Sequence, residues 1–238
     1  TPHVVYFFHC FQTGRGPLQE VHNMRSVAVT CTFLLCIAGA FAQLAIPPTR
    51  DGYSVVFGSA NAPIVIEGYG DLSCPDTMAA WPGWMDAVSH YDGKVALAYH
   101  GYPLPYHITA FRLHQCGAVV QAKAGDDAFR AYVNRAYDPK VQPFFFNSNV
   151  TEAMNTEEII DLIYDKFELS GIVSRSDLQD LCKPSSPFDY ATRTMWKAGA
   201  MRGVYGTPQV FVNGLPLADF DPSWALSEWK KVIEPLLA

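Results

Sequence analysis

The chain has 238 residues, a length that suits one domain or one domain with a large insertion. Hydrophobic residues make up 49% of it, which is ample for a sizeable core and excludes a chain that is disordered throughout. The formal net charge of −6 argues against nonspecific nucleic-acid binding, so we expect no nucleic-acid partner.

The N-terminal segment has the pattern of a secretory signal. Met24-Arg25 precedes an apolar run that closes with Ala40-Phe41-Ala42. A basic start, a short apolar core and an A-x-A close favour cleavage before Gln43. The alternative is a transmembrane anchor, but the run is shorter than the ~20 apolar residues that a span needs.

These features predict three parts of the chain. Residues 1–23 precede the plausible initiator methionine and form an upstream leader that we exclude from the fold. Residues 24–42 form the signal peptide, and residues 43–238 form the mature chain, which has no membrane span. The predicted location is therefore secreted or within the endomembrane lumen.

Two strands joined by a helix are predicted next. Residues 53–57 are typical of a short edge strand, and Ile64-Val65-Ile66 predicts a buried strand. A helix follows from Pro75 to about His90. Residues 94–99 are apolar and suit a parallel strand, so the helix between them makes a βαβ crossover.

Cys74 lies between the first buried strand and this helix. Pro75 suits the first helical position, where its missing N–H has no cost and its φ is already set. At such a helix N-terminus, unpaired backbone N–H groups and the helix dipole favour a thiolate. Asp76 opposes the thiolate by like-charge repulsion, but across solvent this is worth ~1 kcal/mol or less.

From residue 107 to Gly203 the apolar spacing is helical. Asn155 with Glu158 three residues later has the form of a capping box, and Ser186-Pro187 opens another helix. Residues 144–146 are three phenylalanines, which are either an exposed binding patch or part of the core. We favour the core, since apolar runs are usually buried.

The C-terminal part returns to sheet. Residues 209–212 and 215–217 predict a hairpin around Asn213-Gly214, which is a strong turn signal. Asp221-Pro222 is predicted to cap and start a final helix that holds Trp224 and Trp229.

Three segments together resemble the thioredoxin superfamily and, within it, the DsbA-like branch, over roughly residues 52 to 236. The segments are Asp71…Cys74-Pro75-Asp76-Thr77, Tyr102-Pro103-Leu104-Pro105-Tyr106-His107, and Gly203-Val204-Tyr205-Gly206-Thr207-Pro208 followed by Phe211-Val212-Asn213-Gly214. The resemblance implies an α/β thioredoxin-like fold with an α-helical subdomain inserted at about residues 107–203. It also implies a cis-proline at Pro208 that faces Cys74. Substrate would then contact the residues of both loops: Pro75, Asp76, Thr207 and Pro208.

The chain departs from this family at one position, because Thr77 stands where the family has its second cysteine. A hydroxyl can donate a hydrogen bond to a thiolate but cannot close a disulfide. Cys74 and Thr77 are thus the candidate catalytic residues of a monothiol thiol–disulfide oxidoreductase. Such an enzyme acts on protein or peptide thiols and disulfides, and an external thiol, with glutathione as candidate co-substrate, resolves the intermediate.

Two alternatives stay open. The site is a relic in a noncatalytic module that binds a protein or peptide beside Pro208, or the chain is a glutathione-dependent transferase or isomerase. This last alternative resembles the kappa-class transferases, in which a hydroxyl side chain activates glutathione. It ranks last, because the hydroxyl would have to stand in the position where this chain retains Cys74. For Cys74 itself, the structural alternative is a buried inert thiol, because structural cysteines are common; it ranks below a functional thiol.

The remaining candidates are structural. Signal cleavage leaves Cys74, Cys116 and Cys182, and a Cys116–Cys182 disulfide stands level with two separate buried thiols, because spacing does not give the Cα distance. Asn149-Val150-Thr151 is a glycosylation sequon. His107 is more readily a structural histidine than a site residue. No metal motif is present, so we expect no metal, and nothing predicts the oligomeric state.

Overall fold

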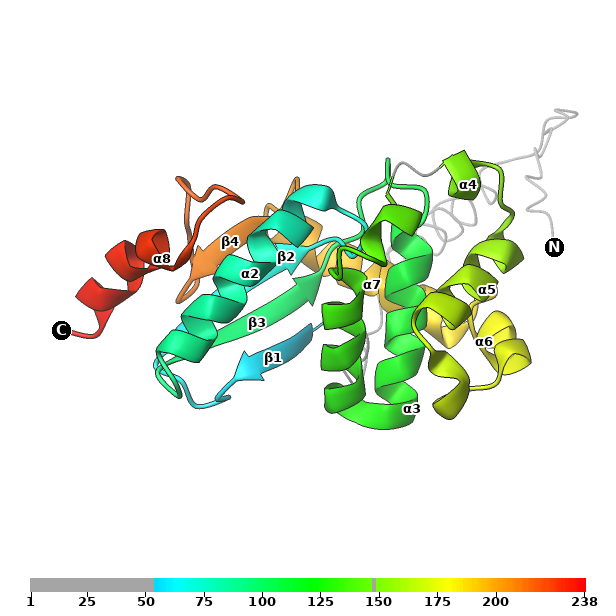
Figure 1. Ribbon diagram of the computed structural model, residues 1–238, viewed down its shortest axis with the longest axis horizontal. Helices are drawn as coiled ribbons and strands as arrows, with labels where there is room; N and C mark the ends of the chain where they lie inside the picture. The colour runs from blue at the N-terminus through cyan, green and yellow to red at the C-terminus, as the bar shows by residue number, and fades with distance from the viewer. Residues whose placement is uncertain (1–53, 147–148) are drawn as a thin grey trace, which may run out of the picture. The chain divides into compact units, whose positions relative to one another are not determined.

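The computed structural model describes residues 54–146 and 149–238 (Figure 1). The predicted leader, the signal peptide and Tyr53 lie outside these residues. The strands are β1 (Ser54–Gly58), β2 (Ile64–Gly70), β3 (Val95–Gly101), β4 (Gln209–Val212) and β5 (Leu215–Pro216). The α-helices are α2 (Pro75–His90), α3 (Ala110–Ala136), α4 (Asn149–Glu152), α5 (Thr156–Lys166), α6 (Arg175–Leu181), α7 (Pro187–Met201) and α8 (Leu226–Ile233). Short 3₁₀ turns are η1 (Gln142–Phe144), η2 (Leu169–Gly171) and η3 (Glu234–Leu236).

The five strands form one mixed sheet in the order β1-β3-β2-β4-β5. β2 and β3 run parallel, with Ile66 opposite Leu97, and α2 connects them. β1, β4 and β5 pair antiparallel with their neighbours. The predicted edge strand, the buried strand and the crossover are confirmed.

Helix α2 lies against one face of the sheet, as Figure 1 shows. It fits closely because Gly68 has no side chain, since a Cβ there would lie 2.9 Å from the Trp84 ring. Trp84 is fully buried, and so is Trp229 of α8. A Cβ on Gly83 would lie 2.1 Å from the Trp224 carbonyl oxygen, so the segment before α8 also packs directly on α2.

Helix α7 packs against the opposite face. Gly199 lies against Tyr102 and Tyr69, since a Cβ there would lie 2.6 Å from the Tyr102 ring and 3.4 Å from the Tyr69 ring. Because side chains alternate along a strand, Tyr69 points away from the face on which Gly68 meets α2. The sheet is therefore covered on both faces.

Helix α3 reverses direction at Gly125, and Figure 1 shows its two arms side by side. Gly125 has φ of 79°, a left-handed value that glycine adopts without steric cost. The Tyr132 hydroxyl on the second arm donates to the Leu113 carbonyl on the first at 2.8 Å. All helices from α3 to α7 lie between β3 and β4 in the chain.

The predicted local signals near α5, α7 and the hairpin are confirmed. Asn155 and Glu158 make a reciprocal capping box, and the Ser186 side chain accepts from the backbone N–H of Asp189. Asn213 and Gly214 both have positive φ, of 48° and 88°, as the turn between β4 and β5 requires.

The start of the last helix was predicted wrongly. α8 begins at Leu226, and Asp221 instead accepts hydrogen bonds from the backbone N–H and the hydroxyl of Ser223. Aspartate forms such local turns as readily as it caps a helix, and here the turn forms. The three phenylalanines divide, because Phe145 is buried whereas Phe144 is 37% exposed.

Candidate functional site

Cys74 occupies the N-cap position of α2, and Pro75 follows at the first helical position, as predicted. The Cys74 backbone N–H donates to the Asp71 carbonyl at 3.0 Å, so residues 71–74 form a tight turn between β2 and α2. The Cys74 side chain is 3% exposed. The chain thus presents one sulfur, almost covered, at a helix N-terminus.

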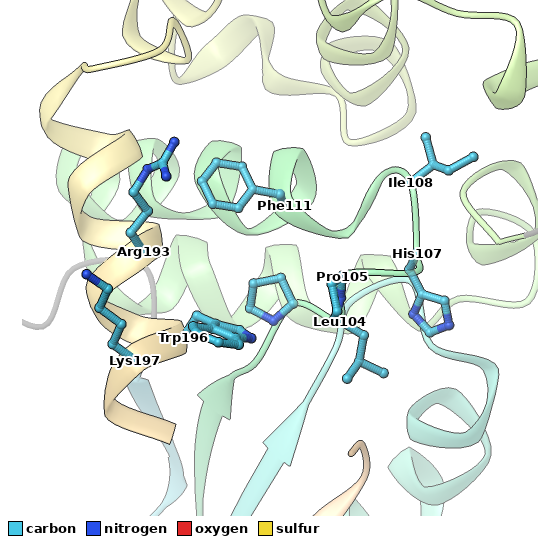
Figure 2. A pocket seen from close by; sticks show the side chains of 9 residues that line it. Leu104, Pro105, His107, Ile108, Phe111, Arg193, Trp196 and Lys197 are labelled. Atoms are coloured by element: carbon cyan, nitrogen blue, oxygen red, sulfur yellow. The ribbon is translucent and has the colours of Figure 1, made fainter. Parts of the chain in front are cut away.

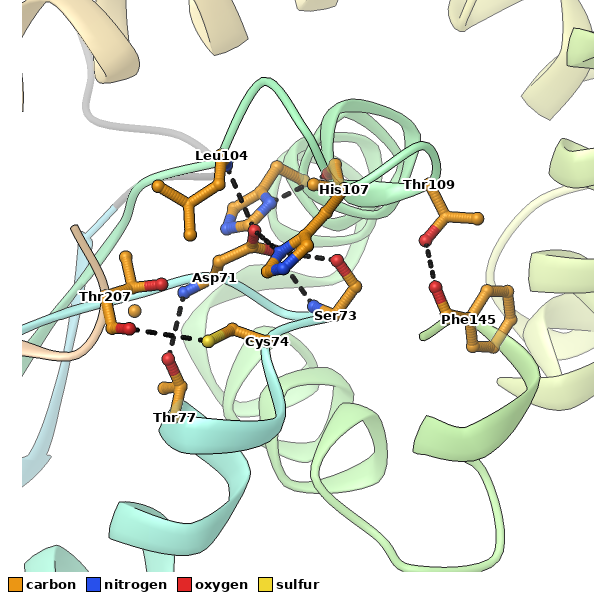
Figure 3. A network of polar contacts seen from close by, with 12 residues as sticks. Asp71, Ser73, Cys74, Thr77, Leu104, His107, Thr109, Phe145 and Thr207 are labelled. Atoms are coloured by element: carbon orange, nitrogen blue, oxygen red, sulfur yellow. Dashed lines mark hydrogen bonds and ion pairs between the residues drawn. The ribbon is translucent and has the colours of Figure 1, made fainter. Parts of the chain in front are cut away.

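The loop that follows α7 meets this sulfur. The Cys74 thiol donates to the Thr207 carbonyl at 3.4 Å, and the peptide bond between Thr207 and Pro208 is cis (Figure 3). These two segments lie 133 residues apart in the sequence. The fold therefore brings Cys74 against the loop of Thr207 and Pro208, whereas contacts of these residues with a substrate remain a prediction.

Thr77 is completely buried one helical turn after Cys74. Its hydroxyl oxygen accepts from the Asp71 backbone N–H at 3.5 Å, a long hydrogen bond. This contact attaches the first turn of α2 to the Cys74 loop. A hydrogen bond from Thr77 to the Cys74 thiolate remains a prediction.

The side chain of Asp71 is the centre of the polar contacts in Figure 3. Its carboxylate is fully buried and accepts from the Ser73 N–H (2.9 Å) and hydroxyl (3.0 Å) and from the Leu104 N–H (3.0 Å). The His107 Nδ1 lies 2.7 Å from the same carboxylate. Asp71 consequently ties the Cys74 loop to the loop between β3 and α3.

Further hydrogen bonds reach the backbone carbonyls of the Cys74 loop. The Gln142 amide donates to the Ser73 carbonyl at 3.0 Å, and the Tyr137 hydroxyl donates to the Asp71 carbonyl at 3.2 Å. The Tyr99 hydroxyl lies 2.9 Å from that of Tyr137. Burial raises the pKa of both tyrosines well above the usual value, so both stay protonated. The Cys74 loop is thus supported by Tyr99 of β3, by Tyr137 directly after α3 and by Gln142 of η1.

Two exposed tyrosines lie on the loops that border the sulfur. Tyr106 lies between Leu104 and His107, which both contact Asp71, and is 68% exposed. Tyr205 precedes the cis-proline and is 88% exposed. The pKa of Tyr106 is raised by desolvation and then by the negative charge of Cys74, Asp71 and Asp76 nearby. Each of these two loops thus carries one exposed aromatic side chain.

A cavity of about 400 Å³ lies between the β3–α3 loop and α7 (Figure 2). Leu104, Phe111 and Trp196 give it apolar walls, and Arg193 and Lys197 of α7 add positive charge. Because Asp71 fixes the loop that forms one wall, this cavity is coupled structurally to the Cys74 loop.

The other two described cysteines lie together elsewhere. The Cys116 and Cys182 sulfurs are 3.4 Å apart and fully buried. Burial, followed by the neighbouring Cys182 sulfur, raises the pKa of Cys116 well above its usual value. Both are thiols in the structure, so a disulfide between them remains a prediction. Glycosylation of Asn149, the first residue of α4, also remains a prediction.

Sequence reasoning undervalued Asp71, His107 and Gln142. Asp71 stood in the motif without a role, and His107 was assigned a structural one. The Pro-Leu-Pro-Tyr-His segment was the only sequence signal for the contact between Asp71 and His107. No neighbouring residue predicted the hydrogen bond from Gln142 to the Ser73 carbonyl. Within residues 54–146 and 149–238, no cluster of three or more metal-ligating side chains occurs. Nor is any helix in this part long and apolar enough to cross a membrane.

The architecture and the site define a thioredoxin-like α/β protein with a cysteine at a helix N-terminus facing a cis-proline loop. A family model described as "Thioredoxin" matches residues 50–234, more than half of the chain. The chain therefore belongs to the thioredoxin family, as the sequence resemblance implied. Among curated proteins, none matches it.

Solved structures share the fold at low sequence identity. A Pseudomonas syringae protein, provisionally described as a protein-disulfide isomerase, is 16% identical with a TM-score of 0.63, covering 75% of this chain and 97% of its own. The Wolbachia pipientis thiol-disulfide exchange protein alpha-DsbA2 is 16% identical (TM-score 0.54; 77% and 87% covered). A periplasmic thioredoxin-like protein from Salmonella enterica serovar Typhimurium is 14% identical (TM-score 0.55; 82% and 99% covered). The fold is thus the DsbA-like variant, with its helical insertion.

Proposed function

We propose that this protein is a monothiol thiol–disulfide oxidoreductase that acts through Cys74. The observation that carries the proposal is the contact between the Cys74 sulfur, at the N-terminus of α2, and the carbonyl that precedes the cis-proline. A thiolate is the nucleophile in disulfide exchange, and a helix N-terminus favours that form.

The substrate is a mixed disulfide between a protein cysteine and a small thiol such as glutathione. The Cys74 thiolate attacks the glutathione sulfur, the original S–S bond breaks, and the substrate cysteine leaves as a thiolate and takes up a proton. A second glutathione thiolate then attacks the glutathione sulfur held on Cys74. It releases the Cys74 thiolate and forms glutathione disulfide, so atoms and electrons balance with no further reductant.

An external thiol is required because, in the part of the chain that the structure describes, the residues near Cys74 supply none. Thr77 presents a hydroxyl, and the sulfurs of Cys116 and Cys182 face one another. Tyr106 and Tyr205 support the role of substrate contacts, because exposed aromatic side chains beside a nucleophile bind extended peptides well.

The relatives support the substrate class and the location. One is described as a protein-disulfide isomerase, one as a thiol-disulfide exchange protein and one as periplasmic. With the apolar run before Gln43, this favours protein thiols as partners and a location outside the cytoplasm. Glutathione is proposed as co-substrate.

The test measures glutathione disulfide released from a glutathionylated peptide, with glutathione as reductant. Wild-type protein should turn over many equivalents, whereas Cys74→Ser should reduce the rate to that of the uncatalysed reaction. The matched control is Cys116→Ala with Cys182→Ala, which should keep the wild-type rate per folded molecule. A Cys74→Ser variant that is as active as wild type contradicts the proposal.

A noncatalytic peptide-binding module is the second candidate, and the 3% exposure of Cys74 favours it. Alkylation of the folded protein separates the two. An enzyme requires that Cys74 react with a small alkylating agent in the native state near neutral pH. A thiol that is labelled only after unfolding, while a peptide still binds, establishes the module instead.

A further inference from the structure

The contact between Cys116 and Cys182 is built into the packing of α3. Cys116 lies on the first arm of α3, and Cys182 is the C-cap residue of α6. Their sulfurs are 3.4 Å apart, whereas a disulfide needs about 2.05 Å, so each sulfur would move by less than about 1 Å. Side-chain rotation on either helix can supply such a movement.

Polar contacts hold the two backbones beside the sulfurs. Arg112, one turn before Cys116, donates to the Cys182 carbonyl at 3.2 Å. Gln115 donates to the Ser186 hydroxyl at 3.4 Å. Residues of α3 next to Cys116 thus hydrogen-bond to both ends of the segment 182–186.

This segment is the turn that joins α6 to α7, and its conformation needs support. Ser185 has φ of 67°, a left-handed value that disfavours residues with a side chain. α6 has only seven residues, too few to be stable without tertiary contacts. A covalent link at Cys182 would fix both features against the long helix α3.

We infer that Cys116 and Cys182 form a structural disulfide that joins α3 to the turn between α6 and α7. Two isolated buried thiols need no mutual contact, yet these two meet across 66 positions of sequence. With the bridge formed, Cys74 is the one thiol among the cysteines that the structure describes.

The oxidation balances with an ordinary disulfide as oxidant. One cysteine thiolate attacks a small-molecule or protein disulfide and releases one thiol. The second cysteine displaces the other half, so two electrons and two protons pass to the oxidant, which becomes two thiols. The step precedes burial of the pair, because in the folded chain neither sulfur is exposed. The proposed location outside the cytoplasm supplies such oxidants.

The bridge would also affect the approach to Cys74. α7 begins directly after the bridged turn and leads through Gly203 into the loop that carries Thr207 and Pro208. Fixing the start of α7 therefore limits movement in the element that delivers the cis-proline loop. The proposal itself does not depend on Cys74 being reactive.

Peptide mapping tests the bridge directly. The full chain is secreted from a eukaryotic host, alkylated before unfolding and during it, and digested with trypsin without reduction. We expect residues 113–123 to appear linked to residues 176–193, with a mass two hydrogens below the sum of the free peptides. Recovery of both peptides alkylated and unlinked overturns the inference, whatever the activity of Cys74.

Thermal unfolding gives an independent readout. A disulfide between Cys116 and Cys182 would close a loop across 66 positions of sequence and should therefore raise Tm. A reductant should lower the Tm of wild-type protein by about 10 °C. Cys74→Ser should keep this shift, and Cys116→Ala with Cys182→Ala should abolish it. An equal Tm with and without reductant contradicts the bridge.

Discussion

Cys74 and the Cys116–Cys182 pair lie in surroundings of opposite character. The Cys74 sulfur contacts a backbone carbonyl from a distant loop, and its own loop is held by the buried carboxylate of Asp71. Cys116 and Cys182 lie in the apolar core between helices, where each sulfur has the other as its neighbour. Polar contacts between loops fix the first site, whereas the second lies where helices pack and has polar contacts only beside the sulfurs.

The difference separates two uses of the same side chain. A sulfur that reacts repeatedly needs a polar setting that stabilises its charged form and a loop that a substrate can reach. A sulfur in an apolar core stays protonated or bonded, because burial penalises the thiolate. Variants that disturb one region while leaving the other unchanged can therefore test this division.

The largest effect is expected from Asp71→Ala in the polar region. Removing the carboxylate leaves the buried N–H groups of Ser73 and Leu104 and the His107 ring without their acceptor. We expect the free energy of unfolding to fall by about 3–5 kcal/mol, because each buried donor left without an acceptor costs about 1–3 kcal/mol. Urea unfolding measures it. Asp76→Ala is the matched control, since Asp76 is exposed and should change little. Equal losses for both would contradict the central role of Asp71.

Arg112→Met disturbs the region of the paired cysteines. It removes the donor to the Cys182 carbonyl but keeps the length of the side chain. We expect a loss of about 1.5 kcal/mol, typical of a hydrogen bond with a charged partner. Lys123→Met, at an exposed position of the same helix, should be nearly neutral in the same urea titration. If Cys74 alkylation slows in Arg112→Met while Lys123→Met leaves it unchanged, the two regions are not independent.

Gly125→Ala tests the reversal that brings the second arm of α3 over Cys116. No atom lies within 4 Å of a Cβ at Gly125, so any loss arises from its left-handed φ alone. We expect about 1–2 kcal/mol from this conformation. Gly171→Ala is the control, because that position is equally open and its φ is not left-handed. Chemical denaturation should rank Gly125→Ala below Gly171→Ala in stability, and the reverse order would refute this reading of the turn.

The smallest effect concerns pH. His114 lies two residues before Cys116, and burial lowers its pKa from 6.5, an effect that the charge of Asp71 opposes. The unfolded chain therefore takes up a proton near pH 6.5 while the folded chain does not. The contribution of this histidine to stability is fully present above that pH and is lost progressively as the pH falls below it. Urea titrations at pH 7 and pH 5 should show a smaller decrease for His114→Gln than for wild type. Identical decreases would exclude this contribution.

Sequence reasoning succeeded where a few neighbouring residues decide the conformation. Pro75 directly after Cys74 set a helix start, and Asn213-Gly214 set a hairpin, because each acts through its own φ and its nearest backbone groups. The expectation that Pro208 faces Cys74 came from the family resemblance, because the residues next to either one do not indicate which distant segment they meet.

What the sequence did not predict depends on distant residues or on a choice between local conformations. Asp71 meets His107 across 36 positions, and neither residue type indicates that partner. The reversal at Gly125 was not predicted, and the open surroundings of this residue leave only its backbone conformation as a reason for glycine. Asp221 had two local conformations of similar cost, and the Ser223 hydroxyl favoured the turn over the cap.

The position of the proposed bridge has one practical consequence. Cys116 and Cys182 stand on either side of α4, α5, α6 and most of α3, so a protease that cut the backbone anywhere between them would not separate the fragments. Without a reducing agent, the nicked molecule would run as a single species in a size measurement under denaturing conditions. The two fragments would separate only after reduction of the disulfide. Limited digestion of this segment would therefore be invisible in any measurement of size made without a reducing agent.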